Sequence, residues 1–496
     1  MKVPLGILAA LVGGVLVGEQ VGGGPARALL VVSILGGAVA FWKRGTRLAV
    51  VTVVVSAGLL GVAVEQRALH GLDVSPLTRA VNDRTSGEAI LTLAEDPDGP
   101  MYQSAAMARV ANFDGLTAGD RSVYVIASGD NVSVLGALDA GDRLRVRGTV
   151  APLHGYATRM RWRHAVGEFR IDDIVAVARP DNAWNAVANA GRRTVLRGSA
   201  VLPSTPRALL SGFLLGDTRA IPDDLVVAFR DAGLSHLLAV SGANVAFALA
   251  VVEPALRRLR RGSRLVGGIG VLVLFGTMTR WEPSVLRASV MAGLVMLARL
   301  LGRPADARRV LVLAMFGLLV ADPFLLHSIG FLLSCGACAG IVIGAQPIAA
   351  RLPGPAWIRE ALGVTTAAQI GVAPLLVATF GTLPLIALPA NLLAAPFVGP
   401  LTVWGIVASL AGGVLGPGPS WWLELPTLSM LRGVEFLARS AATVPLAIDG
   451  RGAILLCVGC AVMVGVTRVV RRRTGRLTSR GWRVHREGQR PDPARP

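Results

Sequence analysis

Long apolar runs recur along this chain, and many of them have the length that a membrane-spanning helix needs. A hydrocarbon core of about 30 Å is crossed by roughly 20 helical residues. Charged residues make up only 16% of the 496 residues, and the mean hydropathy is +0.58. The pattern predicts a polytopic α-helical membrane protein of about ten or eleven spans, with runs at residues 3–18, 26–42, 48–64, 234–252, 265–280, 284–301, 309–321, 324–345, 361–380, 384–415 and 452–470.

Positive charge lies mainly in the short loops between these runs. The net charge is +19, and nearly all of the basic residues are arginines because lysine occurs only at Lys2 and Lys43. Basic loops lie on the cytoplasmic side of a membrane protein. We therefore expect a multi-pass protein of the cytoplasmic membrane with both termini inside and residues 65–233 outside, and with basic inner segments at 43–47, 257–264, 303–309 and 468–476. The charge indicates orientation first and only permits binding to nucleic acid.

Two C-terminal regions differ from plain spanning helices. Residues 384–415 contain too many prolines for one regular helix, so we expect a broken helix or a re-entrant pair. Residues 427–447 carry charged side chains on roughly one face, which favours a helix lying in the membrane interface. The prolines are Pro384, Pro389, Pro396 and Pro400, and the charged residues are Arg432, Glu435 and Arg439.

A segment of different character separates the first three runs from the rest. Short alternating stretches, divided by Asp, Gly and Asn, predict strands at 88–94, 105–113, 121–127, 142–150 and 168–178. Such a series favours a small inserted β-barrel, with an OB-like fold as the candidate. The expected organisation is three transmembrane helices, an extracytoplasmic OB-like domain, membrane-surface amphipathic helices, a transmembrane domain and an Arg-rich tail, at residues 1–64, 65–185, 186–233, 234–470 and 471–496.

An arginine stripe near the end of the soluble segment favours contact with an anionic partner. Arg159, Arg161 and Arg163 alternate, as residues on one side of a strand do, and Trp162 would face the other way. Such a strand could follow a phosphate backbone of DNA while the tryptophan stacks on a base. A solvated strand face, or arginines lying against lipid headgroups, explains the same stripe.

Polar residues inside the apolar runs are candidates for the lining of a conduit. If residues 234–252 form one helix, then His236, Ser241 and Asn244 lie within an arc of about 140°. Polar groups on one side of a spanning helix usually face the bundle interior or a pore. Ordinary interhelical hydrogen bonds explain the pattern equally well. Other polar candidates in apolar surroundings are Arg287, Gln369 and Asn391.

Arg287 is the most costly of these residues because it is charged and lies just inside the outer end of its run. Its guanidinium group could contact an anionic polymer, pair with Glu282 of the same turn, or extend outward to the interface. The sequence leaves these three possibilities open.

Motifs for enzymatic chemistry are weak. The cysteines form two CxxC pairs, Cys335/Cys338 and Cys457/Cys460, inside apolar runs with glycines around the first pair, which favours close helix packing over metal binding. Neither lysine stands in a Gly-Lys-Ser/Thr context, so the chain has no Walker A loop. We expect no catalytic residue, no metal and no cofactor. A Ser–His protease built on Ser241 is a minor alternative.

Four segments, in order over about residues 190–450, resemble the ComEC competence family of membrane channels for incoming DNA. They are LLSGFLLGDTRAIPDDLVVAFRDAGLSHLLAVSGANV, EPSVLRASVMAGLVMLARLLGR, DPFLLHSIGFLLSCGACAGIV and FGTLPLIALPANLLAAPFVGPL. The chain departs from many members at Asn244, where they have His, and at Leu332, where they have Gln. The family position of Ser334 adds it to the candidate channel lining.

The resemblance implies a channel subunit, without enzymatic activity of its own, that passes one strand of transforming DNA through the bilayer. An external DNA receptor and a separate cytoplasmic ATPase or helicase are the implied partners, and a homo-oligomer is left open. Many members continue into a metallo-β-lactamase-like domain, and we expect a short form without it because the chain ends about 26 residues after its last apolar run. The alternatives are a secondary transporter for a small solute, an assembly protein and the intramembrane protease.

Overall fold

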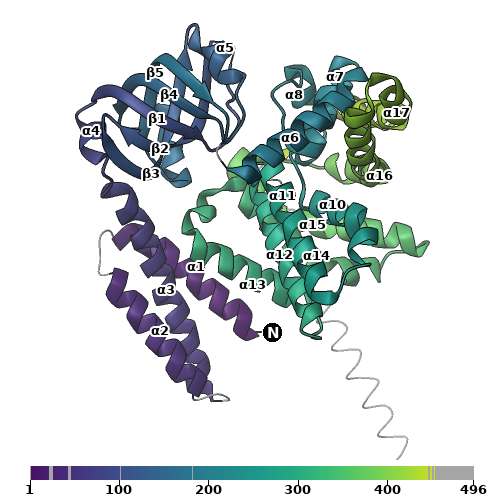
Figure 1. The fold of residues 1–496 in the computed structure, drawn as a ribbon. Coiled ribbons are helices and arrows are strands. Elements are labelled where there is room, and N and C mark those ends of the chain that lie inside the picture. The colour runs from purple at the N-terminus through teal and green to yellow at the C-terminus, as the bar shows by residue number, and fades with distance from the viewer. Residues whose placement is uncertain are drawn as a thin grey trace, which may run out of the picture. The chain divides into compact units, whose positions relative to one another are not determined.

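The N-terminal part of the chain consists of three long helices. The computed structural model describes residues 2–21, 26–42, 46–100, 102–180, 182–444, 447–449 and 452. The helices are α1 (Lys2–Val21), α2 (Ala26–Trp42) and α3 (Arg47–Asp73) (Figure 1). α1 and α3 pack closely at Gly14. The carbonyl oxygen of Gly58 lies so near Gly14 that an added Cβ would overlap it. α3 continues beyond residue 64, where the apolar run stops, and the polar residues Glu65 and Gln66 are buried.

The segment after α3 forms a closed β-barrel, and the five predicted strands are confirmed within the described residues. Around the barrel the order is β1-β2-β3-β5-β4, with β3 and β5 parallel and the other neighbours antiparallel. Phe113 and Phe169 meet edge to face in its core, with ring centroids 6.3 Å apart. The strands are β1 (Ser86–Leu93), β2 (Gln103–Phe113), β3 (Leu116–Ser128), β4 (Arg143–Ala151) and β5 (Ala165–Ala178), and the short helices are α4 (Thr78–Asn82) and α5 (Asn131–Gly136).

The strand predicted through Arg159, Arg161 and Arg163 is wrong. This segment is a 3₁₀-helix, η1 (Gly155–Arg163), which ends at His164 in a left-handed conformation with φ 66°. A 3₁₀-helix has three residues per turn, so residues three apart share a face. Ala157 and Met160 are buried at that spacing. The alternating arginines therefore do not point to one side.

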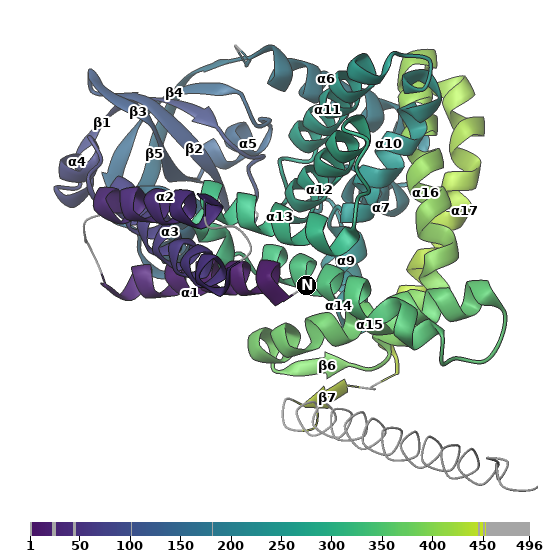
Figure 2. The same cartoon turned by 90° about the horizontal axis from the view of Figure 1, so that it is seen from below.

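The barrel is followed by a bundle of helices (Figures 1 and 2). One apolar core is shared by buried residues of α6, α7, α8, α9, α16 and α17, and α16 packs along α17. In chain order the elements are α6 (Ala183–Gly198), η2 (Ser199–Val201), α7 (Ser204–Leu215), α8 (Asp223–Asp231), α9 (Ser235–Leu238), α10 (Gly242–Leu256), α11 (Arg261–Met278), α12 (Pro283–Leu300), α13 (Ala307–Ala321), η3 (Pro323–His327), α14 (Ile329–Ala349), α15 (Ala356–Phe380), α16 (Ala387–Leu415) and α17 (Pro417–Ala442).

The polytopic class is confirmed. Among the described residues, six helices are long and apolar enough to cross a bilayer, and they belong to α1, α3, α12, α14, α15 and α16. Two shorter apolar helices cover Ala26–Val39 and Gly242–Leu256. Apart from its first residue, the predicted run at 452–470 lies outside the described residues, as do the pair Cys457/Cys460 and the tail at 471–496.

The expectation of one helix over residues 234–252 is wrong. α9 ends at Leu238 and α10 begins at Gly242. Ser241, the N-cap residue of α10, has an extended backbone with ψ 157°. His236 and Asn244 therefore belong to two separate helices, and the arc calculated for one helix does not apply to them.

The expectation of a broken helix over residues 384–415 is also wrong. α16 runs without interruption from Ala387 to Leu415 and contains Pro396 and Pro400. Pro389 lies in its first turn, where a missing N–H costs nothing because that donor has no partner in the helix. Long helices in membranes tolerate internal prolines when neighbouring groups satisfy the backbone. The helix predicted in the interface at 427–447 begins earlier, at Pro417, as α17.

A second unit contains Ala373–Leu385 and the described residues 447–449. In its described part, β6 (Thr382–Pro384) pairs antiparallel with β7 (Ala447–Asp449), and Leu383 lies opposite Ile448.

The close packing expected around the first cysteine pair is present between α14 and α15. A Cβ at Gly340 would overlap the carbonyl oxygen of Ala367, and one at Gly371 would overlap that of Gly336. Small residues at these positions let the two backbones touch, as in the small-xxx-small motifs of membrane helices.

This contact gives a prediction for a pair of Gly→Ala substitutions. Gly340→Ala should lower the free energy of unfolding by about 1–3 kcal/mol, because the added methyl group overpacks the contact. Gly293→Ala in α12 is the control, because nothing lies within 4 Å of its added Cβ, and it should gain up to about 1 kcal/mol from helix propensity. Denaturant unfolding in detergent measures both. Equal effects of the two substitutions would contradict the packing.

Candidate functional site

Three of the family-like segments meet at the side chain of Arg287, which is 5% exposed. Its Nε donates to Ser334 Oγ at 2.9 Å, and its Nη1 donates to Cys338 Sγ at 2.5 Å and to Met291 Sδ at 3.4 Å. All of these partners are neutral. Among the described residues, no carboxylate lies within ion-pair distance of this buried guanidinium group. A group of this kind inside a membrane protein indicates function, because its burial is costly.

The break between α9 and α10 lies directly against this guanidinium group. Ser284 Oγ donates to the carbonyl oxygen of Val240 at 2.5 Å and fixes the connection onto the first turn of α12. A Cβ at Gly242 would lie 2.7 Å from Arg287 Nη2. Glycine lets the N-terminal end of α10 lie against Arg287 without displacing the guanidinium group, which gives a physical reason for the Ser-Gly sequence at this position.

Asn244 connects the start of α10 to α7. Its side chain is 4% exposed, its Nδ2 donates to the carbonyl oxygen of Phe213 at 2.7 Å, and its Oδ1 accepts from Ser241 Oγ at 3.0 Å. Phe213 belongs to the last turn of α7, where carbonyl oxygens lack partners within the helix. The amide satisfies one of them.

The structure thus brings together four of the predicted lining residues, Ser241, Asn244, Arg287 and Ser334, which with Gly242 and Cys338 form the Arg287 cluster. The other three make none of the hydrogen bonds that hold this cluster. His236 is exposed on α9, Gln369 is half-buried on α15, and Asn391 donates to the carbonyl oxygen of Ala387 in its own helix at 2.7 Å. Whether any of the seven residues lines a conduit stays a prediction.

The residues predicted to contact DNA have partners inside the protein. The ring of Trp162 stacks on His327 with centroids 3.7 Å apart and an interplanar angle of 4°. Arg163 pairs with Glu95 at 2.5 Å, Arg161 with Asp73 at 3.4 Å, and the guanidinium carbon of Arg159 lies 5.7 Å from the ring centroid of Tyr156. In this conformation Trp162 packs the barrel onto η3, and DNA contact at these four residues stays a prediction.

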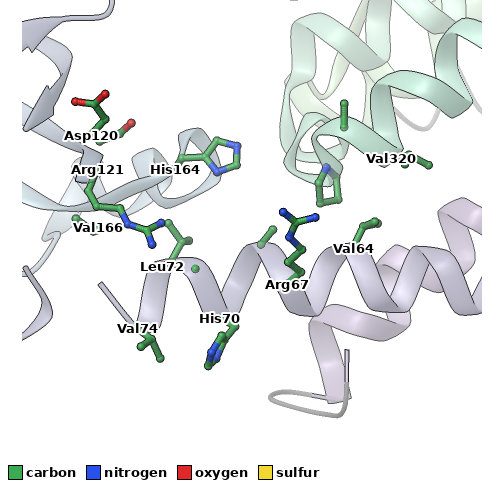
Figure 3. Close-up of a pocket in the computed structure, with 15 residues that line it drawn as sticks. Val64, Arg67, His70, Leu72, Val74, Asp120, Arg121, His164, Val166 and Val320 are labelled. Atoms are coloured by element: carbon green, nitrogen blue, oxygen red, sulfur yellow. The ribbon is translucent and has the colours of Figure 1, made fainter. Parts of the chain in front are cut away.

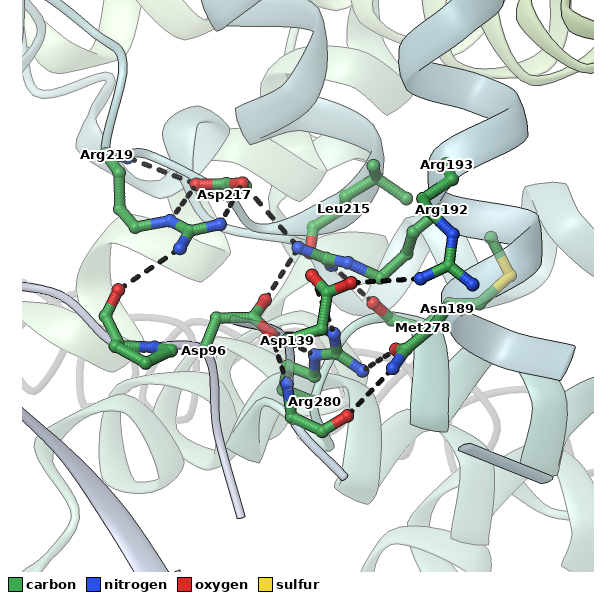
Figure 4. Close-up of polar contacts among 12 residues, drawn as sticks. Asp96, Asp139, Asn189, Arg192, Arg193, Leu215, Asp217, Arg219, Met278 and Arg280 are labelled. Atoms are coloured by element: carbon green, nitrogen blue, oxygen red, sulfur yellow. Dashed lines mark hydrogen bonds and ion pairs between the residues drawn. The ribbon is translucent and has the colours of Figure 1, made fainter. Parts of the chain in front are cut away.

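A second polar arrangement, the ionic junction, holds the barrel to the helices (Figure 4). Asp96 lies between β1 and β2, and its carboxylate accepts from Arg192 of α6 at 2.7 Å and from Nε of Arg280, in the α11–α12 turn, at 2.9 Å. Arg192 is 3% exposed and also donates to the carbonyl oxygens of Leu215 and Met278, at 3.2 and 2.6 Å. One arginine therefore links α7, α11 and the barrel.

Asp217 and Arg219, which belong to the first family-like segment, extend the ionic junction. Arg219 donates to both carboxylate oxygens of Asp217, at 2.8 and 2.7 Å, and to the carbonyl oxygen of Pro97 in the barrel at 3.1 Å. Asp217 also lies 3.6 Å from Arg192. The bidentate geometry is the strong form of an arginine–carboxylate contact.

The turn that presents Arg280 is strained. Arg280 and Trp281 have φ values of 56° and 55°, in the left-handed region that non-glycine residues rarely adopt. The backbone N–H of Trp281 donates to the carbonyl oxygen of Gly276 at 2.7 Å, which closes the turn. The charged contacts of Arg280 offset this strain.

The carboxyl groups of the junction are held in their charged form. Burial raises the pKa of Asp96, but Arg192 and Arg280 outweigh burial and bring this pKa below its usual value. Burial likewise raises the pKa of Asp217, and hydrogen bonds from Arg219 outweigh it. Since both pKa values are lower in the folded chain than the unfolded value of about 3.9, these groups stabilise the fold above about pH 4, and the stabilisation is lost as the pH falls through the folded-state values.

A buried carboxyl group lies between α1 and α3. Glu65 is 0% exposed, and both of its oxygens lack a hydrogen-bond partner among the described residues. The side chain of Glu65 packs over Gly18 of α1. The residue after Gly18 is Glu19, whose Oε2 lies 3.4 Å from Nε2 of His327. After the Arg287 cluster, the surroundings of Glu65 are the second polar site that lies within otherwise apolar helices.

Sequence reasoning missed the central residues of the ionic junction. Asp96 and Arg280 lie in loops that match no motif. Arg192 carried a weak signal, because it lies three residues from Asn189 on a face of α6 that also buries Ala188 and Val195. A pair of polar residues at core positions of an amphipathic helix indicates a buried polar contact.

The comparisons with known proteins cover the part of the chain that contains the Arg287 cluster. The profile of the Competence protein family matches residues 213–473, which is more than half of the chain. The chain belongs to the competence protein family. The match begins at Phe213, whose carbonyl oxygen accepts from Asn244, and it includes the whole Arg287 cluster.

Two curated proteins are similar to this chain over part of its length. ComE operon protein 3 of Bacillus subtilis (strain 168) is 23% identical over 334 residues, which cover 66% of this chain and 41% of that protein. The uncharacterized protein YcaI of Escherichia coli (strain K12) is 25% identical over 277 residues, 52% of this chain and 36% of that protein. The chain therefore spans less than half the length of these relatives. No solved structure matches it significantly.

The ionic junction gives a prediction about stability and pH. Asp96→Asn should lower the free energy of unfolding by about 3–5 kcal/mol, because it leaves two buried arginines without their shared carboxylate. Asp173→Asn, at an exposed position of β5, is the control and should change it by less than about 0.5 kcal/mol. The difference in unfolding free energy between wild type and Asp96→Asn should shrink as the pH falls below about 4, the unfolded-state value, and should be lost once the pH is below the lowered pKa of Asp96 in the folded chain. A difference that stays constant or grows as the pH falls through this range would contradict the account.

The Arg287 cluster gives a second prediction. Asn244→Ala should cost about 1–3 kcal/mol of unfolding free energy, because the buried Phe213 carbonyl oxygen loses its donor. Asn391→Ala is the matched control: its amide bonds only within its own helix, so the loss should be less than about 1 kcal/mol. Thermal unfolding in the same detergent compares them, and a larger effect at Asn391 would disprove the assignment.

Proposed function

We propose that this chain is a membrane channel subunit that moves single-stranded DNA across the cytoplasmic membrane during natural transformation. One observation carries the proposal: the N-terminal end of α10 and the buried guanidinium group of Arg287 lie against each other. The family membership and the four family-like segments support the same conclusion.

The electrostatics of this arrangement favour a phosphate group. The N-terminus of a helix carries about half a positive charge and presents free N–H groups. The guanidinium group of Arg287 adds a full charge, and its described partners are a hydroxyl, a thiol and a thioether. A phosphodiester passing this point would meet a positive potential inside an apolar bundle. Passage requires the α9–α10 connection to move away from α12, because Arg287 is 5% exposed.

The barrel supports the delivery of a strand to this point. Its strand order β1-β2-β3-β5-β4 with parallel β3 and β5 supports an OB-like fold, and OB-folds bind single strands across the face of strands 2 and 3. The ionic junction anchors the barrel at the turn before α12 through Arg280, which lies seven residues before Arg287 along the chain. We keep Arg159, Arg161, Trp162 and Arg163 as candidate DNA contacts, which would require their present contacts to open.

The proposal includes orientation and partners. Both termini lie in the cytoplasm and the barrel lies outside, as the basic loops indicate. The sequence has no Walker A loop, so a separate cytoplasmic ATPase or helicase would supply the energy and an external receptor would deliver the DNA. We propose no enzymatic activity for the chain itself.

A second candidate function is secondary transport of a small anionic solute. The interrupted path from α9 to α10 favours it, because such transporters use the ends of half-helices to bind anionic groups. The two functions differ in the size of what passes.

Proteoliposomes distinguish them. Vesicles holding the purified chain should protect a labelled single-stranded oligonucleotide from added nuclease after uptake. Arg287→Gln should reduce the rate by about tenfold or more, since a charge-assisted hydrogen bond contributes about 1.5–3 kcal/mol. Arg287→Lys should retain part of the rate, and Arg299→Gln, at an exposed position of the same helix, should retain all of it.

The outcome that contradicts the channel is also defined. Vesicles that take up phosphate or small organic anions through Arg287, but never protect an oligonucleotide, would support the transporter instead. Unfolding temperatures within a few degrees of wild type should be checked first for each variant, so that a lost fold is not taken for a lost path.

A further inference from the structure

A pocket lies where α3, the barrel and η3 meet (Figure 3). Its volume is about 580 Å³, within the range of small-ligand sites. The helices supply apolar side chains, among them Val64, Leu72 and Val320, and Arg67, Arg121 and His164 supply basic groups. Apolar and cationic groups thus share one pocket.

Two guanidinium groups converge on one face of α3. Gly71 lies four residues after Arg67 and so shares its face of the helix. A Cβ at Gly71 would lie 3.6 Å from Arg121 Nη1, which places the barrel arginine over this face. Figure 3 shows the guanidinium groups of Arg67 and Arg121 turned toward the same space.

No carboxylate of the described residues forms an ion pair with either arginine. Asp120 is the one acidic residue of the described lining, and its carboxylate is turned away from both guanidinium groups (Figure 3). His164 is held in place at the pocket by Asp322, with Nε2 and Oδ1 3.1 Å apart. Two cations that face each other without a counter-charge repel, so an anion between them would be stabilising.

The distance of the pocket from the start of α3 indicates which anion would be available to it. Arg67 follows Leu48, the first residue of the candidate span Leu48–Asp73, by about 29 Å of helix at 1.5 Å per residue. The hydrocarbon core is about 30 Å thick. Arg67 therefore lies at the height of the lipid headgroups, where phosphate is the most abundant anion.

We propose that this pocket binds the headgroup of a membrane phospholipid, with its phosphate between Arg67 and Arg121. The apolar side chains of Val64 and Val320 would contact the first carbons of the acyl chains. The described lining contains no Phe, Tyr or Trp, whereas sites for single-stranded nucleic acid stack bases on such rings. The bound lipid fastens the barrel to α3, and this role is independent of what the chain transports.

The test uses the full-length chain, purified in detergent and freed of lipid. Its unfolding temperature should rise on addition of phosphatidylglycerol and should not rise with diacylglycerol of the same acyl chains, which lacks the phosphate. The double substitution Arg67→Gln with Arg121→Gln should abolish most of the rise. Arg109→Gln, at an exposed position of β2 outside the pocket, should keep it.

A charge reversal separates lipid binding from a merely structural role. Arg67→Glu places a carboxylate beside Arg121, so the lipid-free protein should unfold at a higher temperature than wild type while its response to phosphatidylglycerol is lost. A response that remains in Arg67→Glu and in the double variant overturns the proposal. The proposal is also overturned if inorganic phosphate or a single-stranded oligonucleotide produces the same arginine-dependent rise and phosphatidylglycerol does not.

Discussion

The carboxylate of Asp96 joins the barrel, which we expect in water, to the helices that follow it, which we expect in the membrane. It belongs to a barrel with its own apolar core, yet its partners Arg192 and Arg280 belong to the helices that follow. Because both arginines are largely buried, each needs this counter-charge, and neither part can separate without exposing unpaired charge to an apolar environment. The turn before α12 is therefore fixed, and with it the helix that carries Arg287.

The effects of this junction extend to the Arg287 cluster through α7. The last turn of α7 has its carbonyl oxygens occupied from two sides: Arg192 donates to Leu215, and Asn244 donates to Phe213. A movement of the barrel would therefore act on the start of α10, which lies on Arg287. This physical connection between the barrel and a buried cation is what the proposed channel needs if binding at the barrel is to open a path at Arg287. The family membership fits this view, although the chain spans less than half the length of its two curated relatives.

Much of the fold could be predicted from periodicity. The strands follow from alternation of apolar residues, most clearly in β1 and β4, where buried and more exposed residues alternate, and the apolar helices follow from their length. The errors came where local pattern and tertiary contact disagree. Alternating arginines at 159–163 looked like a strand, but burial of Ala157 and Met160 at a spacing of three selects a 3₁₀-helix. The prolines of 384–415 looked like breaks, but the continuous helix α16 accommodates them.

The candidate site was predictable only in part. Ser241, Asn244 and Arg287 were singled out as polar residues in apolar runs and Ser334 by its family position, and the structure brings the four together. The junction residues Asp96 and Arg280 were not singled out. Both lie in loops, and the local sequence around a loop residue does not show which distant residue it contacts. The lipid pocket needs the same long-range information, since Arg67 and Arg121 come from a helix and a strand.

The central claim is that a DNA strand passes between the start of α10 and Arg287, and a photocrosslinker in this gap tests it most directly. Ala288 is the position to label, because its Cβ lies 3.2 Å from where a Cβ at Gly242 would be. Vesicles in which a labelled strand has been stalled during uptake should give a protein–DNA adduct from position 288 and none from Leu313, a 58% exposed residue of α13. Adducts from position 313 alone, or none from position 288 while uptake proceeds, would contradict this path.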